Sequence, residues 1–334
     1  MRKKKLTMYD LAAACGVSIA TVSRAINGLK DVRPATRERI FCRMKELGYH
    51  PSRTARALST GQTQVVSVWV GMLRHQLTTT FLAELERHLA EAHYEMLLRD
   101  LWQQPFESGA LPVAADGIIV IECLAWLDKL LASPRAALIP VVSLGLYWCD
   151  AVDHVGIDLT NGVRQAVEHL VETGCRRIGY LVPQKAAVPN NTRYRTYLET
   201  MERAGLDPQV MVTPRVSERA EIEHAFEQHL ARGIRLDGLL CYNDDHAITA
   251  YRVLRRRGLR VPQDVCIIGC NGSQEAEYLE CPLSTIVVPA ADACAAAWRL
   301  LENRMRDPNL PIQSVILEAR LAIRASSQPK THLD

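Results

Sequence analysis

Short apolar runs alternate with amphipathic segments over most of the chain, from residue 64 onward. The runs are bounded by Gly, Pro or Asp and cover residues 65–70, 117–121, 139–145, 177–182, 238–242 and 265–270. Between many of them, apolar residues recur at helical spacing, as in "FLAELERHLAEA", "GVRQAVEHLVETG" and "AITAYRVLRRRG". Continuous apolar strands separated by helices indicate parallel sheets that are covered on both faces. The strands are too many for one small sheet, so we expect an α/β body of two doubly wound halves.

The first fifty residues follow a different pattern, one of short helices only. Leu11 and Cys15 lie at helical spacing, and Gly16 ends that helix. Ser18 then supplies a hydroxyl that can cap a second helix of about eight residues. The apolar face of a third helix, which begins at Pro34, consists of Ile40, Met44 and Leu47. A helix, a turn with Gly and a second helix form the helix-turn-helix pattern, so we expect a small all-α head.

The charge is divided unevenly between the two parts of the chain. Residues 1–60 contain 13 Lys and Arg against 4 Asp and Glu, a net charge of +9, whereas the remainder carries −6. A basic module attached to a mildly acidic body is typical of nucleic-acid binding combined with a second task.

The start of the second helix has side chains that suit a DNA groove. The second helix of a helix-turn-helix enters the major groove with its N-terminal residues. We therefore expect Ile19 and Ala20 to be exposed in the free protein and to contact thymine methyls. Thr21 and Ser23 have hydroxyls suited to phosphates, and Arg24 can reach guanine or a phosphate.

The segment "YHPSRTARALSTGQTQ" can open a short helix at Pro51 and close it at Gly61. This helix has almost no face that could join a core, and an isolated helix so short is unstable in water. The segment is therefore either a loop or a helix that becomes ordered only on a partner.

The head resembles that of the lactose/galactose repressor (LacI/GalR) family of bacterial regulators. The resemblance runs over some sixty residues and includes the V-S-x-x-T-V-S-R core at 17–24, Gly-Tyr-x-Pro at 48–51 and A-R-x-L at 55–58. It implies that the segment after Pro51 is a hinge helix that folds on operator DNA, with Leu58 wedged into the central minor-groove step. The DNA contacts expected from residue types and resemblance together are Thr7, Tyr9, Ser18, Ile19, Ala20, Thr21, Ser23, Arg24, Asn27, Arg53, Ala55 and Leu58.

The body resembles the effector domain of the same family, which is similar to periplasmic sugar-binding proteins. The similar parts include "HVGIDLTNGVRQAVEHLVETGCRRIGYL" and "CPLSTIVVP". The resemblance implies that the chain crosses between the halves near 158–162 and 286–290, with a small ligand in the cleft at the carboxyl ends of the strands. The expected domains are a helix-turn-helix domain at 1–49, a hinge helix and linker at 50–62, a first subdomain at 63–161 with 290–322, and a second at 162–289.

The family's ligand contacts correspond to residues at several strand ends. Its Arg corresponds to Arg193, its Asn-Asp to Asn243 and Asp244, and its Asp to Asn271. At Asn271 a neutral amide replaces a carboxylate, and a further polar position becomes Val288. The complete set of expected effector contacts is Thr78, Thr79, Asp158, Asn191, Arg193, Asn243, Asp244 and Asn271.

Structural roles for several of these residues remain open at this point. Asp158 either binds ligand or caps the following helix, and Asn243 and Asp244 precede a helix that they could simply cap. Arg193 could be a surface residue, although its place after a strand-end loop favours the ligand role. Thr78 and Thr79 are expected in the first cleft loop.

The connection between "MLLRD" and "DGIIV" is short. It has only about fifteen residues, too few for a full helix.

Nothing in the sequence indicates catalysis, so we expect no enzyme, cofactor or metal. The nucleotide-binding patterns GxGxxG and GxxxxGK[ST] and the GxSxG elbow of hydrolases are absent. The ten Cys residues are scattered, and the spacing of Cys266 and Cys270 suits core packing better than zinc. Because no apolar stretch is long enough for a membrane span and Asp10 interrupts the basic start, we expect a cytoplasmic protein.

We therefore expect a transcriptional regulator that binds a palindromic operator as a homodimer, with its DNA affinity modulated by a sugar or related metabolite. "ASSQPKTHLD" at the end has no heptads, which favours a dimer over a tetramer. Two alternatives stay open. One is a regulator without a small effector or controlled by a protein partner, and the other is a sugar-binding module whose head is unused.

Overall fold

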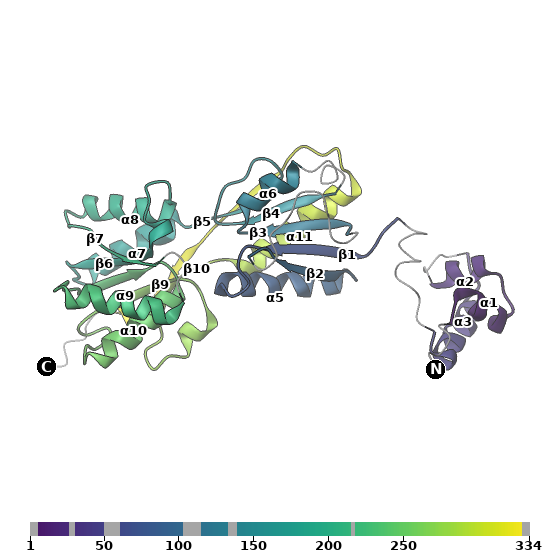
Figure 1. The fold of residues 1–334 in the computed structure, drawn as a ribbon, viewed down its shortest axis with the longest axis horizontal. Helices are drawn as coiled ribbons and strands as arrows, with labels where there is room; N and C mark the ends of the chain where they lie inside the picture. The colour runs from purple at the N-terminus through teal and green to yellow at the C-terminus, as the bar shows by residue number, and fades with distance from the viewer. Residues whose placement is uncertain are drawn as a thin grey trace. The chain divides into compact units, whose positions relative to one another are not determined.

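A computed structural model of the protein describes residues 6–26, 31–49, 61–102, 115–132, 139–214 and 218–328. The chain forms two compact units, Met1–Gln64 and Val65–Asp334. We call them the head and the body, and each is described by itself (Figure 1).

The head contains α1 (Met8–Cys15), α2 (Ile19–Ile26) and α3 (Pro34–Leu47) around one small core. Leu11, Cys15 and Ile40 are buried in it, as their spacing predicts. Gly16 and Gly48 end α1 and α3 in the left-handed conformation, with φ of 61° at each, which glycine adopts without a steric penalty. The sequence prediction of a small helical head is confirmed.

The body alternates strands and helices throughout. The elements of its first half are β1 (Val65–Val70), α5 (Gln76–Glu91), β2 (Glu95–Asp100), β3 (Gly117–Ile121), α6 (Leu124–Leu131), β4 (Val141–Gly145) and β5 (Asp153–Asp158). Those of the second half are α7 (Thr160–Glu172), β6 (Ile178–Pro183), η2 (Gln184–Ala186), α8 (Thr192–Arg203), β7 (Gln209–Thr213), α9 (Arg219–Ala231), β8 (Gly238–Cys241), α10 (Asp244–Arg256), β9 (Cys266–Asn271), η3 (Gln274–Glu277) and β10 (Ser284–Val287). The elements that follow are α11 (Ala290–Arg306), β11 (Ser314–Glu318), β12 (Arg320–Ala322) and η4 (Ala325–Ser327).

Two six-stranded sheets organise these elements. Their strand orders are β11-β5-β4-β3-β1-β2 and β12-β10-β9-β8-β6-β7, and every pair is parallel except β10 with β12. This confirms two doubly wound halves.

The chain crosses between the sheets three times, after β5, after β10 and at Ala319 between β11 and β12. The sequence analysis expected two crossings and assigned residues up to 322 to the first half. β12 instead pairs with β10 in the second sheet, because Arg320–Ala322 lies against Thr285–Val287 in register.

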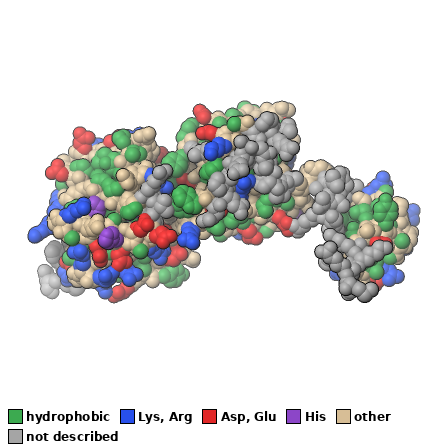
Figure 2. Space-filling view, viewed as in Figure 1, with side chains coloured by type: hydrophobic (Ala, Val, Ile, Leu, Met, Phe, Trp, Pro, Cys, Tyr) green, Lys and Arg blue, Asp and Glu red, His purple; other side chains and the backbone are tan. Residues whose placement is uncertain are grey.

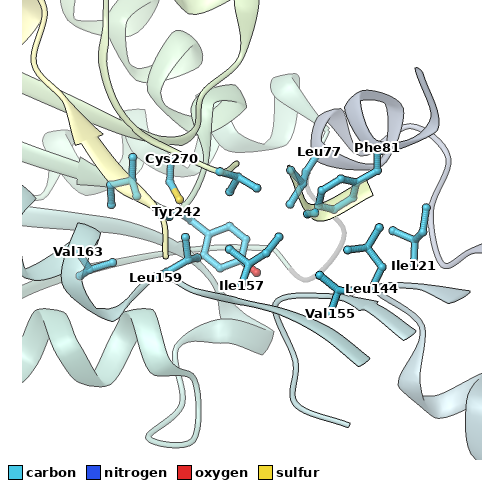
Figure 3. Packing of buried hydrophobic residues seen from close by; sticks show 14 of the residues in the cluster. Leu77, Phe81, Ile121, Leu144, Val155, Ile157, Leu159, Val163, Tyr242 and Cys270 are labelled. Carbon is cyan, nitrogen blue, oxygen red and sulfur yellow. The ribbon is translucent and has the colours of Figure 1, made fainter. Parts of the chain in front are cut away.

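Helices cover both faces of each sheet. In the first half, α5 and α11 share one face while Leu127 and Leu130 of α6 pack on the other. In the second half, α7 and α8 cover one face, and α9 and α10 cover the other (Figure 1). The main core continues from one half to the other through the crossing segment, where Tyr242 lies beside Ile157 and Leu159 (Figure 3).

The surface of the body carries interspersed acidic and basic side chains on the face shown in Figure 2. Within the described ranges, no helix is long and apolar enough to cross a membrane.

Candidate functional site

The first turn of α2 is held by the hydroxyl of Ser18. Its Oγ accepts a hydrogen bond from the Thr21 amide at 3.1 Å and lies 2.9 Å from Thr21 Oγ1. Ala20 is exposed, as expected for a groove-facing residue. Ile19, however, is half-buried, because its side chain packs against the head core. The expectation that Ile19 is exposed is therefore wrong for the free head.

Three other predicted DNA contacts have structural tasks or partial burial in the free head. Thr7 forms a capping box with Asp10: the Thr7 amide donates to Asp10 Oδ2 at 2.8 Å, and the Asp10 amide donates to Thr7 Oγ1 at 3.3 Å. Ser23 is half-buried. Arg24 is exposed and pairs with Asp31 at 3.2 Å. Because an exposed ion pair contributes little to stability, Arg24 can exchange Asp31 for another anion at small cost.

Tyr9 of α1 is 72% exposed, an unusual position for a large aromatic side chain without a partner surface. The predicted contacts Asn27, Arg53, Ala55 and Leu58 lie outside the described residues.

In the body, the carboxyl ends of the strands of both sheets bring polar side chains together around Arg193. Arg193 is 5% exposed, and its guanidinium carbon lies 3.6 Å from the centre of the Tyr242 ring. Its Nη1 donates to the Tyr242 carbonyl oxygen at 2.9 Å. This arrangement fixes a cation in a desolvated position, where its interactions are strong.

A carboxylate from the first half lies close to this cation. Glu122 follows β3 with φ of 52°, and its Oε1 accepts a hydrogen bond from the Leu146 amide. Burial raises the pKa of the Glu122 carboxyl, while the Leu146 amide and the Arg193 charge oppose the rise. Gly145 makes room for this carboxylate, because a Cβ at Gly145 would collide with it.

Tyr147 adds a phenol from the first half at the same place. Its side chain is partly exposed, and the nearby Tyr242 phenol raises the pKa of Tyr147. Glu122, Tyr147 and Arg193 therefore bring an acceptor, a phenol and a cation within electrostatic reach of one another. Such a set can hydrogen-bond a polar ligand.

A second group of polar residues, His75, Asn243 and His246, joins the two halves within electrostatic reach of Arg193. His75 directly precedes α5, and its Nε2 lies 3.5 Å from Asn243 Nδ2. Asn243 Oδ1 caps α10 by accepting from the His246 amide at 3.0 Å and lies 2.6 Å from His246 Nδ1. Burial lowers the pKa of His75 to about 4 and that of His246 to about 3. Both rings are therefore neutral near pH 7.

Asn271 ends β9 in a left-handed backbone conformation, with φ of 113°, which is rare for a residue with a side chain. It is 7% exposed, and neither its Oδ1 nor its Nδ2 has a hydrogen-bond partner. Val288, the apolar replacement noted in the sequence, is buried, and its amide donates to the Asn271 carbonyl at 3.4 Å. A strained residue with an unsatisfied buried amide is typical of a binding site.

Asp244 is fully buried and is engaged away from the cleft. Its Oδ2 accepts from the Ser273 amide and its Oδ1 from the Thr285 hydroxyl, each at 2.6 Å. Burial raises the pKa of Asp244 to about 6. The carboxylate therefore ties α10 to the loop after β9 and to β10.

The remaining predicted ligand residues also have local hydrogen bonds. Asp158 Oδ1 accepts from the Thr160 amide at 2.8 Å, which fits the capping alternative, and Asn191 caps α8 through the Tyr194 amide at 3.2 Å. Thr78 and Thr79 lie in the first turn of α5 rather than in a loop.

Sequence comparison places the chain among known regulators. Residues 7–52 match the model of bacterial regulatory proteins of the lacI family, and residues 167–327 match a periplasmic binding protein-like domain. Over 339 residues the chain is 31% identical to the HTH-type transcriptional regulator CelR of Thermobifida fusca, covering 97% of this chain and 99% of that protein. The chain belongs to the lacI family.

Solved structures agree with this membership. The lac repressor dimer bound to operator and the anti-inducer ONPF has the same fold, with a TM-score of 0.82 over 97% of this chain and 99% of that one at 23% identity. A transcriptional regulator CelR–cellobiose complex matches at 27% identity and a TM-score of 0.67, over 96% and 99% of the two chains. As a lacI-family member, the protein is a DNA-binding transcriptional regulator.

The sequence analysis missed several cleft residues of this lacI-family body. Glu122, Tyr147 and Tyr242 were not singled out, although Glu122 and Tyr242 each directly follow an apolar strand. That position was the available signal, because ligands of open α/β sheets bind at the carboxyl ends of strands. Across the described part of the chain, no group of three or more His, Cys, Asp or Glu residues could hold a metal ion.

Proposed function

We propose that this regulator is a repressor that binds a palindromic operator as a homodimer and is controlled by a small carbohydrate bound in the body cleft. It acts in the cytoplasm and catalyses no reaction. The solved CelR complex with cellobiose and the lac repressor dimer on operator support a sugar effector and a dimeric state.

Asn271 carries the ligand part of the proposal. A buried amide without partners costs about 1–3 kcal/mol for each unsatisfied group. A hydroxyl of a sugar both donates and accepts, so one or two such groups satisfy Oδ1 and Nδ2 together. Glu122 and Arg193 add a second acceptor and a second donor. We propose Arg193, Asn243 and Asn271 as direct ligand contacts and Asp158, Asn191 and Asp244 as supports.

The head carries the DNA part of the proposal. α2 enters the major groove with Ala20, Thr21 and Arg24 toward the bases and phosphates, and Ile19 reaches a thymine methyl from its place at the edge of the head core. Residues 50–62 form the hinge, in which Leu58 opens the minor groove at the centre of the operator.

Selection of the purified full chain on random duplex DNA at moderate salt tests the DNA part. We expect enrichment of a palindrome with a central C·G step. Leu58→Ala should weaken binding to that palindrome, whereas Arg232→Ala, a charge-removing control on the exposed end of α9, should not. Failure of the unliganded wild-type chain to enrich any sequence would contradict a repressor that binds in its ligand-free state.

The selected operator then tests the effector part. Its dissociation constant is measured with and without mono- and disaccharides. We expect at least one saccharide to change operator affinity through its differential affinity for the two conformations of the body. Operator binding that no saccharide alters would instead favour a regulator without a sugar effector.

A further inference from the structure

The acidic residues of the basic head differ in their surroundings. Within residues 1–60 they are Asp10, Asp31, Glu38 and Glu46. Asp10 belongs to the capping box of α1, and Glu46 pairs with Arg43 at 2.6 Å on α3. Glu38 of α3 is exposed and pairs with no cation among the described residues. Asp31 is the acid that pairs with α2, the helix expected in the major groove.

The Asp31 contact involves the one basic side chain of α2. Arg24 Nη1 lies 3.2 Å from Asp31 Oδ2, and both side chains are more than half exposed. Asp31 begins the turn that leads to α3, and the next residue, Val32, is buried in the head core. Because Val32 anchors this turn, the Asp31 carboxylate has a defined place beside α2.

We propose that Asp31 is a specificity-determining residue of the DNA-binding head. It holds the Arg24 guanidinium for a guanine and lowers the affinity of the same guanidinium for phosphates. The inference rests on the proposed function, in which α2 enters the major groove with Arg24, and adds to it the origin of base discrimination at one position of the operator.

The guanidinium of Arg24 can hold Asp31 and a guanine at the same time. It has five N–H donors in one plane, and its contact with the carboxylate is made through Nη1 alone. The donors that remain include pairs that match the O6 and N7 acceptors of guanine in the major groove. The carboxylate also restricts the long side chain before DNA is bound, so less conformational freedom is lost when Arg24 binds the base.

A phosphate, in contrast, competes with Asp31. Sequence-independent affinity for DNA comes from Lys and Arg side chains that neutralise phosphates. A phosphate that binds Arg24 either replaces the Asp31 carboxylate or brings a second negative charge beside it. Guanine is uncharged and requires neither. Asp31 therefore weakens binding to unrelated DNA more than binding to a site with guanine at this position.

The exposure of the pair determines the size of this effect. An ion pair that is open to solvent changes an equilibrium constant by no more than about fivefold. The head has a net charge of +9 over residues 1–60, so its other cations still supply contacts to phosphates. Asp31 is therefore expected to change the choice between sequences and to leave operator binding itself intact.

Equilibrium binding of the full chain to three duplexes tests the inference. They are the palindrome obtained by selection, the same duplex with the base pair read by Arg24 replaced, and a duplex of unrelated sequence. Arg24→Ala identifies that base pair as the position at which discrimination is lost. Asp31→Asn should tighten binding to the unrelated duplex about threefold and reduce discrimination at the Arg24 position about fivefold.

Glu38→Gln is the matched control, because it removes the same charge from the head without removing a partner of Arg24. It should leave discrimination at the Arg24 position unchanged and should tighten binding to the unrelated duplex less than Asp31→Asn does. In a chain that already carries Arg24→Ala, Asp31→Asn should not change discrimination at that position any further.

The possible failures of the inference and of the proposed function differ. If Asp31→Asn keeps the full base preference of wild type, or changes binding to all three duplexes by the same factor, the role of Asp31 is wrong and the proposed function stands. The same conclusion follows if Arg24→Ala loses no base preference at any position. If the wild-type chain prefers no sequence, the proposed DNA-binding function is wrong as well.

Discussion

The guanidinium carbon of Arg193 lies over the Tyr242 ring, 3.6 Å from its centre, and Nη1 donates to the carbonyl oxygen of the same residue. Two interactions with one partner hold the charged group in place. A ligand therefore meets a cation that is already oriented, and little conformational entropy is lost on binding.

Arg193→Lys should weaken effector binding by at least about tenfold, because an ammonium can neither stack on Tyr242 in this way nor keep the planar fork. Operator binding without ligand should stay the same. The control is Arg195→Lys, on the exposed side of the same helix, where Arg195 pairs with Glu199 at 3.7 Å. Titration of both variants with the saccharide that wild type binds provides the measurement, and equal losses in the two variants would argue against the role of Arg193.

Gly145→Ala should displace the Glu122 carboxylate and destabilise the body by about 1–3 kcal/mol, because the added methyl collides with it and φ at Gly145 is 155°. Urea unfolding gives the free energy. If the collision is the cause, the double variant Gly145→Ala/Glu122→Ala should be less destabilised than the sum of the two single variants. Additive losses would mean that backbone strain alone is responsible.

The neutral ring of His246 makes stability depend on pH. Its pKa in the fold is about 3, below the ordinary value of 6.5, so its stabilising contribution is complete above pH 6.5 and is lost as the pH falls from there toward 3. Between pH 7.5 and 5 the wild-type chain should lose more unfolding free energy than His246→Gln. The exposed His224→Gln should follow wild type. Parallel pH profiles for all three chains would contradict a buried neutral imidazole.

Asp244 should make the free energy of unfolding depend on pH in the direction opposite to His246. Its pKa is raised from 3.8 to about 6, so the stability linked to its protonation is complete below pH 3.8 and is lost as the pH rises through about 6. Asp244→Asn removes this titration but turns one amide hydrogen toward the Ser273 or Thr285 donor. We expect it to lose about 1–3 kcal/mol at pH 5 and less at pH 7.5. Unfolding in urea at the two pH values measures the difference, and a larger loss at pH 7.5 would contradict the raised pKa.

Thr7→Ala should loosen the head without affecting the body, because it removes the capping box that Thr7 forms with Asp10. The expected cost is about 1 kcal/mol, equivalent to about fivefold faster hydrogen exchange of α1 amides. Thr7→Ser keeps the hydroxyl and should exchange nearly as wild type does. If both variants exchange equally fast, the methyl group of Thr7 rather than its hydroxyl stabilises α1.

Continuous apolar runs allowed the most accurate predictions from sequence. Residues 65–70 and 117–121 became β1 and β3 without any change of boundary, since a strand buried on both faces is a nearly continuous apolar run, interrupted in β1 only by Ser67. The start of α5 was missed because Thr78 and Thr79 suggested a loop. The Thr79 hydroxyl instead bonds to the Gln76 carbonyl within the helix, at 2.8 Å.

The cleft was less predictable, because its chemistry depends on contacts between distant segments. Arg193 was expected from its loop, but the Tyr242 ring that holds it comes from another strand end, 49 residues later. Glu122 directly follows β3, but its contact with the Leu146 amide depends on the space at Gly145, which no local pattern reveals. The sheet to which β12 belongs is likewise decided by pairing with β10, which no periodicity in three residues reveals.

The order of the strands also constrains how the protein is made. Strand β5 of the first sheet is complete once Asp158 has been synthesised, but the edge strand β11 of that sheet ends only at Glu318. Helix α11, which covers one face of the sheet, is also synthesised late, at Ala290–Arg306. At about 5–20 residues per second, a ribosome needs roughly 8–30 s to synthesise the roughly 160 residues between Asp158 and Glu318. Throughout that time the nascent first half lacks its edge strand and the helix beside α5. A codon change that slows translation after residue 158 would prolong this exposure, and chaperone dependence should increase even though the amino-acid sequence is unaltered.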